Sequence, residues 1–309
     1  MTSISDAVLI CPGQGAQRAG GVADLADRLE DLPPLGRRAF ETASTIVGCD
    51  LWQLGLSPDP DDEVALRMPS LLQPYLVAWA AAEYSQVSGV VGPMGFVTGH
   101  SSGLNSAIAI SGAVELESTL HFAWKCGRNM DRDCVESPGG LLALVGAGRA
   151  AAEAIAAESG ASLANHNAPD QTVIGGSFPA IRRAQERAPS HGCQAVELRV
   201  AGAFHTPSFQ PSDQANRALI DALPIADRFT PIVGNRSGQI ISDPAALRDE
   251  LCAQYVRPVE WLSVLETLYG VGARRFITLG PGNVMAGLVR RYGKTTPDRI
   301  QIRRSAQLR

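Results

Sequence analysis

A serine flanked by two glycines is the feature of this sequence best suited to chemistry. The segment Gly99-His100-Ser101-Ser102-Gly103 has the G-x-S-x-G spacing of a nucleophile elbow, a sharp turn from a strand into a helix. Both ends of such a turn need glycine because larger side chains would clash with neighbouring elements, and the turn strains the serine. N–H groups at the start of the helix favour a developing negative charge. The sequence therefore predicts that Ser101 is a nucleophile.

A serine hydroxyl needs a general base, and the chain offers His100, His121, His166, His191 and His205. His100 adjoins the serine, and consecutive residues at the end of a strand point apart. His121 falls within a predicted helix, and His166 and His191 fall in or beside a predicted small domain. His205 is the best candidate by elimination. No Asp or Glu stands where an α/β-hydrolase has its third triad member, so we expect another group to orient the imidazole.

Apolar runs separated by glycine-rich turns predict a large α/β domain around the serine. Ala7–Cys11 is typical of a buried strand, and residues 90–98 predict the strand that enters the elbow. The other predicted elements of this domain are helices over residues 104–110 and 114–133 and strands over residues 232–234 and 276–279.

A smaller domain is predicted in the middle of the chain. Its strands and helices alternate as β-α-β-β-α-β over residues 141–145, 149–158, 162–165, 172–175, 179–188 and 194–200. This order is the ferredoxin-like plan. Because the large domain resumes afterwards, we predict a small domain of residues 138–201 inserted into a large domain of residues 1–137 and 202–309.

Composition excludes several classes of protein. The chain has 309 residues, 45% of them hydrophobic and 19% charged, which is typical of a globular protein and not of disorder, coiled coil or collagen. No membrane span and no secretory signal are visible, so we expect a cytoplasmic protein. The six cysteines lack metal-type spacing, so we expect reduced thiols and no metal. Without a heptad pattern, we expect a monomer.

Positive charge gathers towards the C-terminus. Residues 270–309 contain nine basic residues and one acidic residue, whereas the whole chain has a net charge of -4. This asymmetry predicts an acidic partner. Nucleic acid is not expected, because no aromatic stacking motif accompanies the arginines.

Several segments together resemble the malonyl-CoA:acyl carrier protein transacylases and the acyltransferase domains of polyketide synthases. The resemblance extends over nearly the full length. In the family's order, the matching segments are Pro12-Gly13-Gln14-Gly15-Ala16-Gln17, Gln73-Pro74, the elbow, residues 167–174, Gly202-Ala203-Phe204-His205-Thr206, Gln254 ahead of residues 258–261, and Gly280-Pro281-Gly282.

This resemblance implies an α/β-hydrolase-like large domain, a ferredoxin-like small domain and an active site in the cleft between them. It implies a Ser101–His205 dyad whose imidazole is held by a backbone carbonyl near Gln254. The backbone N–H groups of Gln14 and Ser102 are implied to form the oxyanion hole. It also implies that no cofactor is bound, since substrates arrive on the phosphopantetheine of acyl carrier proteins.

The acyl pocket implied by the resemblance departs from the family at one position. Its implied residues are Gln73, Cys126, Met130, Asn167 and Phe204. Malonyl enzymes have an arginine in an R-G-x-x-M segment, which pairs with the free carboxylate; here that segment begins with Cys126. Arg128 cannot replace it, because two residues along a helix is a rotation of about 200°. A malonyl group would lose a contact worth about 1.5–3 kcal/mol, so we predict a neutral or aminated acyl group.

We therefore predict a discrete acyltransferase of polyketide biosynthesis that moves a non-dicarboxylic acyl group between carrier proteins by a ping-pong reaction. It is similar in type to the dipeptidyl (aminoacyl) acyltransferases of macrolactam antibiotic pathways, such as the vicenistatin acyltransferase. Three alternatives stay open: an editing thioesterase, a malonyl-CoA:acyl carrier protein transacylase, and a degenerate carrier-binding protein without activity.

Carrier proteins are acidic, so exposed arginines are candidates for docking them. The predicted docking residues are Arg182, Arg183, Arg187, Arg274, Arg275 and Arg299.

Overall fold

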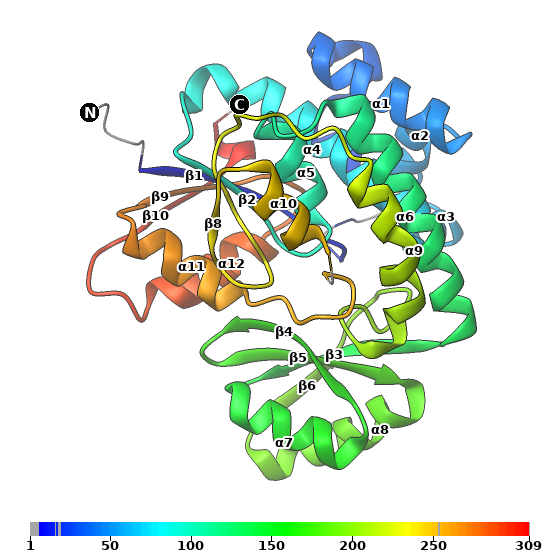
Figure 1. Ribbon diagram of the computed structural model, residues 1–309, viewed down its shortest axis with the longest axis vertical. Helices are drawn as coiled ribbons and strands as arrows, with labels where there is room; N and C mark the ends of the chain where they lie inside the picture. Colours follow the sequence, from blue (N-terminus) through cyan, green and yellow to red (C-terminus); the bar gives the residue numbers. More distant parts are fainter. Residues whose placement is uncertain (1–5, 16, 18–19, 253, 309) are drawn as a thin grey trace.

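The protein contains two separate β-sheets, one above the other in Figure 1. The structure is a computed structural model that describes residues 6–15, 17, 20–252 and 254–308. Helices enclose the larger sheet, whereas the smaller sheet has helices on one side only among the residues described (Figure 1).

The larger sheet has six strands in the order β10-β9-β1-β2-β7-β8. Its strands are parallel except for β8, which runs antiparallel to β7. Their bounds are β1 (Ala7–Cys11), β2 (Phe96–Gly99), β7 (Ile232–Val233), β8 (Ile240–Ile241), β9 (Arg275–Thr278) and β10 (Gln301–Arg304). In the central pair, Cys11 is in register with Gly99. The loop after β1 and the elbow after β2 therefore leave the sheet at the same edge, side by side.

Both faces of β1 are buried, which explains its continuous apolar run. Leu9 and Cys11 pack on one side, whereas Val8 and Ile10 pack on the other side in a second apolar cluster.

The helices of this domain are α1 (Pro34–Val47), α2 (Leu51–Leu56), α3 (Pro60–Ala65), α4 (Pro69–Val91), α5 (Gly103–Ile110), α6 (Leu116–Glu136), α9 (Gln210–Asp221), α10 (Pro244–Leu251), α11 (Trp261–Gly270) and α12 (Val284–Gly293). Short 3₁₀ helices occupy Gly21–Asp24, Leu29–Asp31, Ala188–His191, Pro207–Phe209 and Ser305–Gln307.

The predicted strand over residues 90–98 was wrong at its start. Val90 and Val91 belong to the last turn of α4, and the strand begins only at Phe96. The helix ends at Gly92, whose φ of 70° is a conformation that glycine adopts readily. Branched apolar residues at a helix end and in a strand give the same sequence signal, so the boundary could not be read from composition.

The smaller sheet is antiparallel, with strand order β4-β5-β3-β6. Its elements follow the predicted β-α-β-β-α-β order: β3 (Gly139–Val145), α7 (Arg149–Ser159), β4 (Ser162–Ala168), β5 (Gln171–Ser177), α8 (Phe178–Arg187) and β6 (Gln194–Glu197). The last strand stops three residues before the predicted Val200. Leu142 and Leu144 pack in the apolar cluster with residues of α7 and α8, which lie on the side away from the larger sheet (Figure 1). The alternate residues, Leu141 and Ala143, face the opposite side.

A short backbone ladder joins the two units. The N–H of His166 donates to the carbonyl of Val259 at 2.8 Å, and the N–H of Val259 donates to the carbonyl of Ala164 at 2.9 Å. The segment before α11 thereby pairs in parallel with β4, the edge strand of the smaller sheet. This pairing fixes the position of the smaller sheet relative to the loops that follow β1 and β2.

The elbow tests this packing directly. A Cβ on Gly103 would lie 2.6 Å from the carbonyl oxygen of Cys11, so Gly103→Ala must push two backbone segments apart. We expect the free energy of unfolding to fall by about 1–3 kcal/mol, the usual cost of overpacking. Gly89→Ala is the matched control, because a Cβ on this exposed helical glycine meets nothing within 4 Å. It should stabilise the protein by about 0.5–1 kcal/mol. Equal denaturation midpoints for the two variants would contradict this account.

Candidate active site

Ser101 occupies a strained turn between β2 and α5. Its φ is 54°, in the left-handed region that side chains other than glycine rarely adopt. The side chain of Asn235 holds both sides of this turn, since its Oδ1 accepts from the Ser101 N–H at 3.2 Å and its Nδ2 donates to the Gly99 carbonyl at 2.8 Å. Asn235 escaped the sequence analysis. Asn235 follows β7, which is parallel to β2, so it lies at the same sheet edge as the elbow. This position was the signal from which it could have been predicted.

His205 lies beside the serine. The Oγ of Ser101 is 2.6 Å from Nε2 of His205, and Nδ1 of His205 is 2.8 Å from the backbone carbonyl oxygen of Gln254. A carbonyl oxygen can only accept, so Nδ1 carries the proton and Nε2 is free to accept the serine hydroxyl. A backbone carbonyl thus stands where a triad would have a carboxylate.

Burial keeps the imidazole of His205 neutral. Its removal from water lowers the pKa, an effect opposed by hydrogen bonding to the backbone of Gln254 and Arg257. His205 also has a φ of 62°, so both members of the pair stand in strained backbone positions. The arrangement provides a hydroxyl, an unprotonated acceptor for its proton and a group that fixes the acceptor's orientation.

His100 has a different environment. Its Nε2 is 2.7 Å from Oδ1 of Asn167, and its ring packs edge-on against Trp261 at 5.2 Å. Burial is the main cause that lowers the pKa of His100 to about 4. Asn167 belongs to β4, so this contact ties the elbow to the smaller sheet. The predicted pocket residue Asn167 is therefore engaged with His100 as well as lining the cleft.

The loop after β1 presents a backbone donor to the elbow. The N–H of Gln14 donates to Oγ of Ser102 at 3.1 Å. This close approach depends on Gly13, because a Cβ there would collide with the carbonyl of His100. The N–H of Gln14, predicted as an oxyanion donor, thus faces the residue that follows the nucleophile.

Two connected hollows meet at Ser101 and His205. The outer compartment has a volume of about 200 Å³ and lies between the domains, with Leu141 and Asn165 on one side and Val284 and Leu288 on the other. The inner compartment has a volume of about 20 Å³, enough for about one water molecule. Its walls are Gln14, Gln73, Ser102, Asn105, Met130, Phe204, Gln254 and Tyr255, in addition to the serine and histidine. A wider, open hollow of about 900 Å³ is lined by other residues and contains neither of the pair.

A chain of hydrogen bonds follows the wall of the inner compartment. Nδ2 of Asn105 donates to Oε1 of Gln73 at 3.0 Å, and Nε2 of Gln73 faces Sδ of Met130 at 3.1 Å. Because sulfur can only accept, this chain fixes the orientation of both amides. Oδ1 of Asn105 is then left buried without a partner among the residues described, in a side chain only 3% exposed. Sequence reasoning did not select Asn105.

Cys126 lies behind the wall of this compartment. It is fully buried on α6 next to the hydroxyl of Tyr255, and burial raises the pKa of its thiol to about 12. The pKa of Tyr255 is also raised, by burial first and by Cys126 second. Arg128 stacks on Trp124 at 5.2 Å and lines neither compartment. The walls of the inner compartment therefore carry no arginine or lysine among the residues described.

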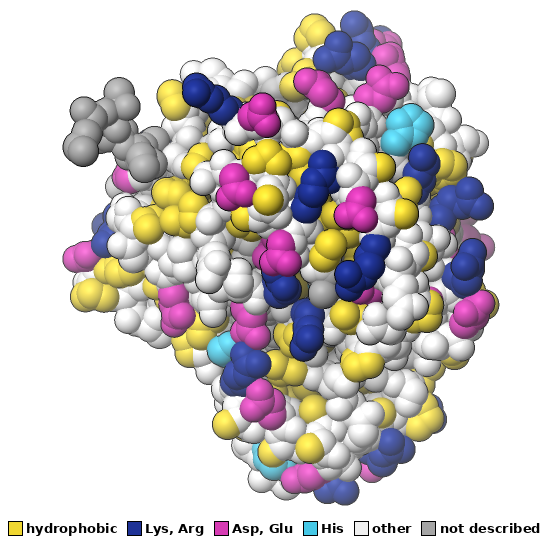
Figure 2. All heavy atoms as spheres, in the orientation of Figure 1, with side chains coloured by type: hydrophobic (Ala, Val, Ile, Leu, Met, Phe, Trp, Pro, Cys, Tyr) yellow, Lys and Arg dark blue, Asp and Glu magenta, His cyan; other side chains and the backbone are white. Residues whose placement is uncertain are grey.

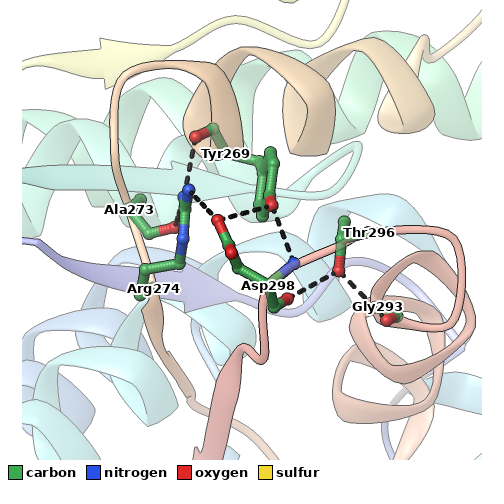
Figure 3. A network of polar contacts seen from close by, with 6 residues as sticks. All are labelled: Tyr269, Ala273, Arg274, Gly293, Thr296 and Asp298. Carbon is green, nitrogen blue, oxygen red and sulfur yellow. Dashed lines mark hydrogen bonds and ion pairs between the residues drawn. The ribbon is translucent and has the colours of Figure 1, made fainter.

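Most of the arginines predicted to dock a carrier make contacts within the chain. Arg183 donates to the carbonyl of Ser159, Arg187 pairs with Glu158 at 2.9 Å, and Arg275 pairs with Asp6 at 2.8 Å. Figure 3 shows Arg274 donating to the carbonyls of Tyr269 and Ala273 and to Asp298. Of the six, Arg182 and Arg299 make no hydrogen bond or ion pair with the described residues.

Three of these arginines, Arg182, Arg183 and Arg187, lie on α8, and the docking role of all six stays a prediction. Helix α8, which carries Arg182, lies on the side of the smaller sheet away from the larger one (Figure 1). Basic and acidic side chains are interspersed over the face seen in Figure 2. Arg199, which the sequence analysis missed, lines the outer compartment with a side chain 83% exposed.

The described part of the chain has neither a cluster of metal ligands nor a helix that could span a membrane. No three His, Cys, Asp or Glu side chains lie close enough together to hold a metal ion. None of its helices is long and apolar enough to cross a membrane.

Comparison with known proteins decides the family. Residues 8–255 match the family model of the acyl transferase domain. The chain belongs to this family. The acyltransferase is 28% identical over 299 residues to the malonyl CoA-acyl carrier protein transacylase of Bacillus subtilis, an alignment that covers 94% of this chain and 92% of the relative. It is 32% identical over 293 residues to the polyketide biosynthesis protein ThaF of Burkholderia thailandensis, covering 93% of this chain and 24% of ThaF.

Solved structures confirm the fold of the acyltransferase. It superposes on the malonyl-CoA:acyl carrier protein transacylase of Xanthomonas oryzae with a TM-score of 0.87 at 29% identity, covering 99% of this chain and 96% of that one. A malonyl-transacylase in complex with a type II polyketide synthase acyl carrier protein gives a TM-score of 0.85 at 26% identity, covering 97% and 95%. The predicted α/β fold with a ferredoxin-like small domain is therefore confirmed.

The neutral state of His205 predicts the pH dependence of the acyltransferase. An imidazole accepts the serine proton only when unprotonated, and burial moves its pKa below the ordinary value of about 6.5. Acylation of Ser101 should therefore stay level as the pH falls through 6.5 and decline only below that. Single-turnover rates across the pH range measure this. Thermal midpoints at each pH are the control, because buried neutral imidazoles also cost stability as the unfolded chain takes up protons below pH 6.5. A decline centred above pH 6.5 would oppose the assignment.

Proposed function

We propose that the acyltransferase moves an acyl group from one phosphopantetheine thiol to another through an ester on Ser101. His205 Nε2 takes the hydroxyl proton as Oγ attacks the thioester carbonyl, and the C–S bond breaks as the proton passes to the leaving thiolate. A second thiol then gives its proton to His205 and attacks the ester carbonyl, and His205 returns the proton to Oγ as the acyl C–O bond breaks. The 2.6 Å contact between Ser101 and His205 supports both halves of this ping-pong cycle.

Acyl carrier proteins are the proposed donors and acceptors. The relative in Bacillus subtilis is named for an acyl carrier protein, and one similar structure was solved with a carrier bound. The outer compartment supplies a passage between the two domains that leads to Ser101, as a long phosphopantetheine arm requires. Arg199 stands in its wall, 3.9 Å from Glu63 and with its side chain 83% exposed, and we propose that it contacts an acidic carrier. The reaction needs no cofactor besides the arm itself.

The acyl group is proposed to lack a terminal carboxylate. The single observation that carries this choice is the absence of an arginine or lysine from the described walls of the inner compartment. Tyr255 stands in that wall, with Cys126 behind it. A carboxylate placed there would lose its water without gaining a charged partner. The missing contact corresponds to about 1.5–3 kcal/mol, or about 10–100-fold in loading rate.

Malonyl transfer is the second candidate. It is favoured by the names of the relatives, most of which are malonyl CoA-acyl carrier protein transacylases. The charge of the pocket and the names of the relatives thus favour different acyl groups, and a loading experiment distinguishes them.

The unpartnered Oδ1 of Asn105 favours an acyl group that carries a hydrogen-bond donor. A buried acceptor without a partner costs about 1–3 kcal/mol, which an amine or hydroxyl on the substrate would recover. This supports an aminoacyl group. The inner compartment is the smaller of the two, which favours a short acyl group over a dipeptidyl group. We therefore propose a short aminoacyl or hydroxyacyl group; the macrolactam pathway remains a prediction.

A panel of acyl-carrier thioesters tests the choice of acyl group. Malonyl, butyryl, 3-hydroxybutyryl and 3-aminopropionyl carriers are each mixed with the enzyme, and intact mass gives the rate at which Ser101 is loaded. We expect the 3-amino group to load about 10–100-fold faster than malonyl. Ser101→Ala should take up none of them. Preferential malonyl loading would overturn the proposal and establish the second candidate.

A holo-carrier acceptor then separates transfer from hydrolysis. Transfer predicts that the acceptor gains the mass of the acyl group. Free acid with no gain in acceptor mass would instead identify an editing thioesterase, because hydrolysis differs only in letting water reach the acyl-enzyme.

Asn105→Leu tests the proposed donor contact. The variant should lose the preference for 3-hydroxybutyryl over butyryl, a ratio of kcat/KM values that we expect to fall about tenfold. Asn129→Leu is the matched control, because Asn129 donates to Asn216 outside both compartments. An unchanged ratio in Asn105→Leu would show that Asn105 does not contact the acyl group.

A further inference from the structure

The hydroxyl of Ser102 lies against a donor that the proposed reaction needs. The backbone N–H of Gln14 donates to Oγ of Ser102 at 3.1 Å, and Ser102 lines the inner compartment beside Ser101. In the proposed reaction, the carbonyl oxygen of the bound acyl group becomes an oxyanion that must itself accept from the Gln14 N–H. The serine oxygen therefore lies where, or directly beside where, that oxyanion will stand.

The side chain of Ser102 does not cap α5, although the residue stands at the N-cap position of this helix. It is the N-cap residue of α5, and serine at this position commonly accepts a hydrogen bond from the first turn of the helix. Here its side chain makes no capping bond. The oxygen has turned instead towards the loop after β1, which belongs to a different part of the chain.

The proton of this hydroxyl is uncommitted. A serine oxygen has two lone pairs and one hydrogen. One lone pair accepts from Gln14, and within the described part of the chain the O–H donates to no other group. A donor beside a strong backbone donor, in a compartment next to the nucleophile, can bind an anionic oxygen.

We propose that the Ser102 hydroxyl is a third oxyanion donor, alongside the backbone N–H groups of Gln14 and Ser102. Two oxygens that share one N–H donor lie about one hydrogen-bond length apart, so the free O–H reaches the oxyanion with a small rotation about χ1. In the empty site, the same hydroxyl keeps the Gln14 N–H satisfied and the loop in place. This inference rests on the proposed function only in taking Ser101 as the nucleophile, and it holds for any acyl group.

Rates of Ser101 acylation test the proposal. Removing one oxyanion donor typically lowers the rate about 10²–10³-fold. With both backbone donors still present, we expect Ser102→Ala to lower the single-turnover rate about 10–100-fold with little change in KM. Ser102→Thr, which keeps the hydroxyl, should retain most of the rate. The control is Ser106→Ala, because that hydroxyl lies on the same helix but donates to the carbonyl of Leu76.

A transition-state mimic supplies a readout that a structural role would not change. Propaneboronic acid forms a tetrahedral adduct on a serine hydroxyl and places an oxygen where the oxyanion stands. Its Kd should rise in Ser102→Ala by the same factor as the rate falls, while the thermal midpoint stays near that of Ser106→Ala. The boronic acid measurement requires no acyl donor, so it tests the role of Ser102 even if no thioester in the panel loads Ser101.

Failure of the inference is distinguishable from failure of the proposed function. If wild-type Ser101 is loaded and Ser102→Ala loads equally fast or faster, the hydroxyl is no donor and the inference falls alone. A matching loss of rate and thermal midpoint in Ser102→Ala and Ser106→Ala would reduce Ser102 to a structural role. If no thioester loads wild-type Ser101, the proposed function fails, and the boronic acid measurement still settles the role of Ser102.

Discussion

The site depends on the close approach of two backbone segments at one edge of the larger sheet. Strands β1 and β2 are parallel neighbours in register, so the loop after one must lie against the elbow after the other. A Cβ on Gly103 would stand 2.7 Å from the carbonyl of Pro12, which leaves no room for a side chain. This contact fixes the Gln14 N–H relative to Ser101, and Asn235 holds the elbow from the opposite side.

In the proposed reaction the strained pair needs no carboxylate, because its imidazole is buried and neutral. A backbone carbonyl orients His205 without adding a charge, and burial keeps the pKa low enough for the ring to act as a base. The proposed oxyanion would then be the only full negative charge at the reacting atoms. Neutral dipoles, the backbone N–H groups at the start of α5 among them, are suited to stabilise it.

The proposed choice of acyl group rests on the side chains that line the inner compartment. Gln73 from α4, Asn105 from α5 and Met130 from α6 form a connected wall of neutral polar atoms. Tyr255 stands in the wall of the compartment, and Cys126 lies behind it without lining the compartment. A pocket built this way discriminates by hydrogen-bond complementarity and by size more than by charge.

The sequence by itself predicted Ser101 as the nucleophile and the β-α-β-β-α-β plan, because glycine spacing and apolar periodicity are local properties of the chain. Its ordered motifs also resembled the family that the comparison establishes. It also excluded Arg128 from the pocket, since helical rotation follows from residue spacing alone. Only the tertiary structure brought Asn235, Asn105 and Arg199 to the cleft and engaged Arg183, Arg187, Arg274 and Arg275 in contacts within the chain. Such neighbours come from segments far apart in the sequence, and their meeting is decided by how helices pack on two sheets, which no local pattern encodes.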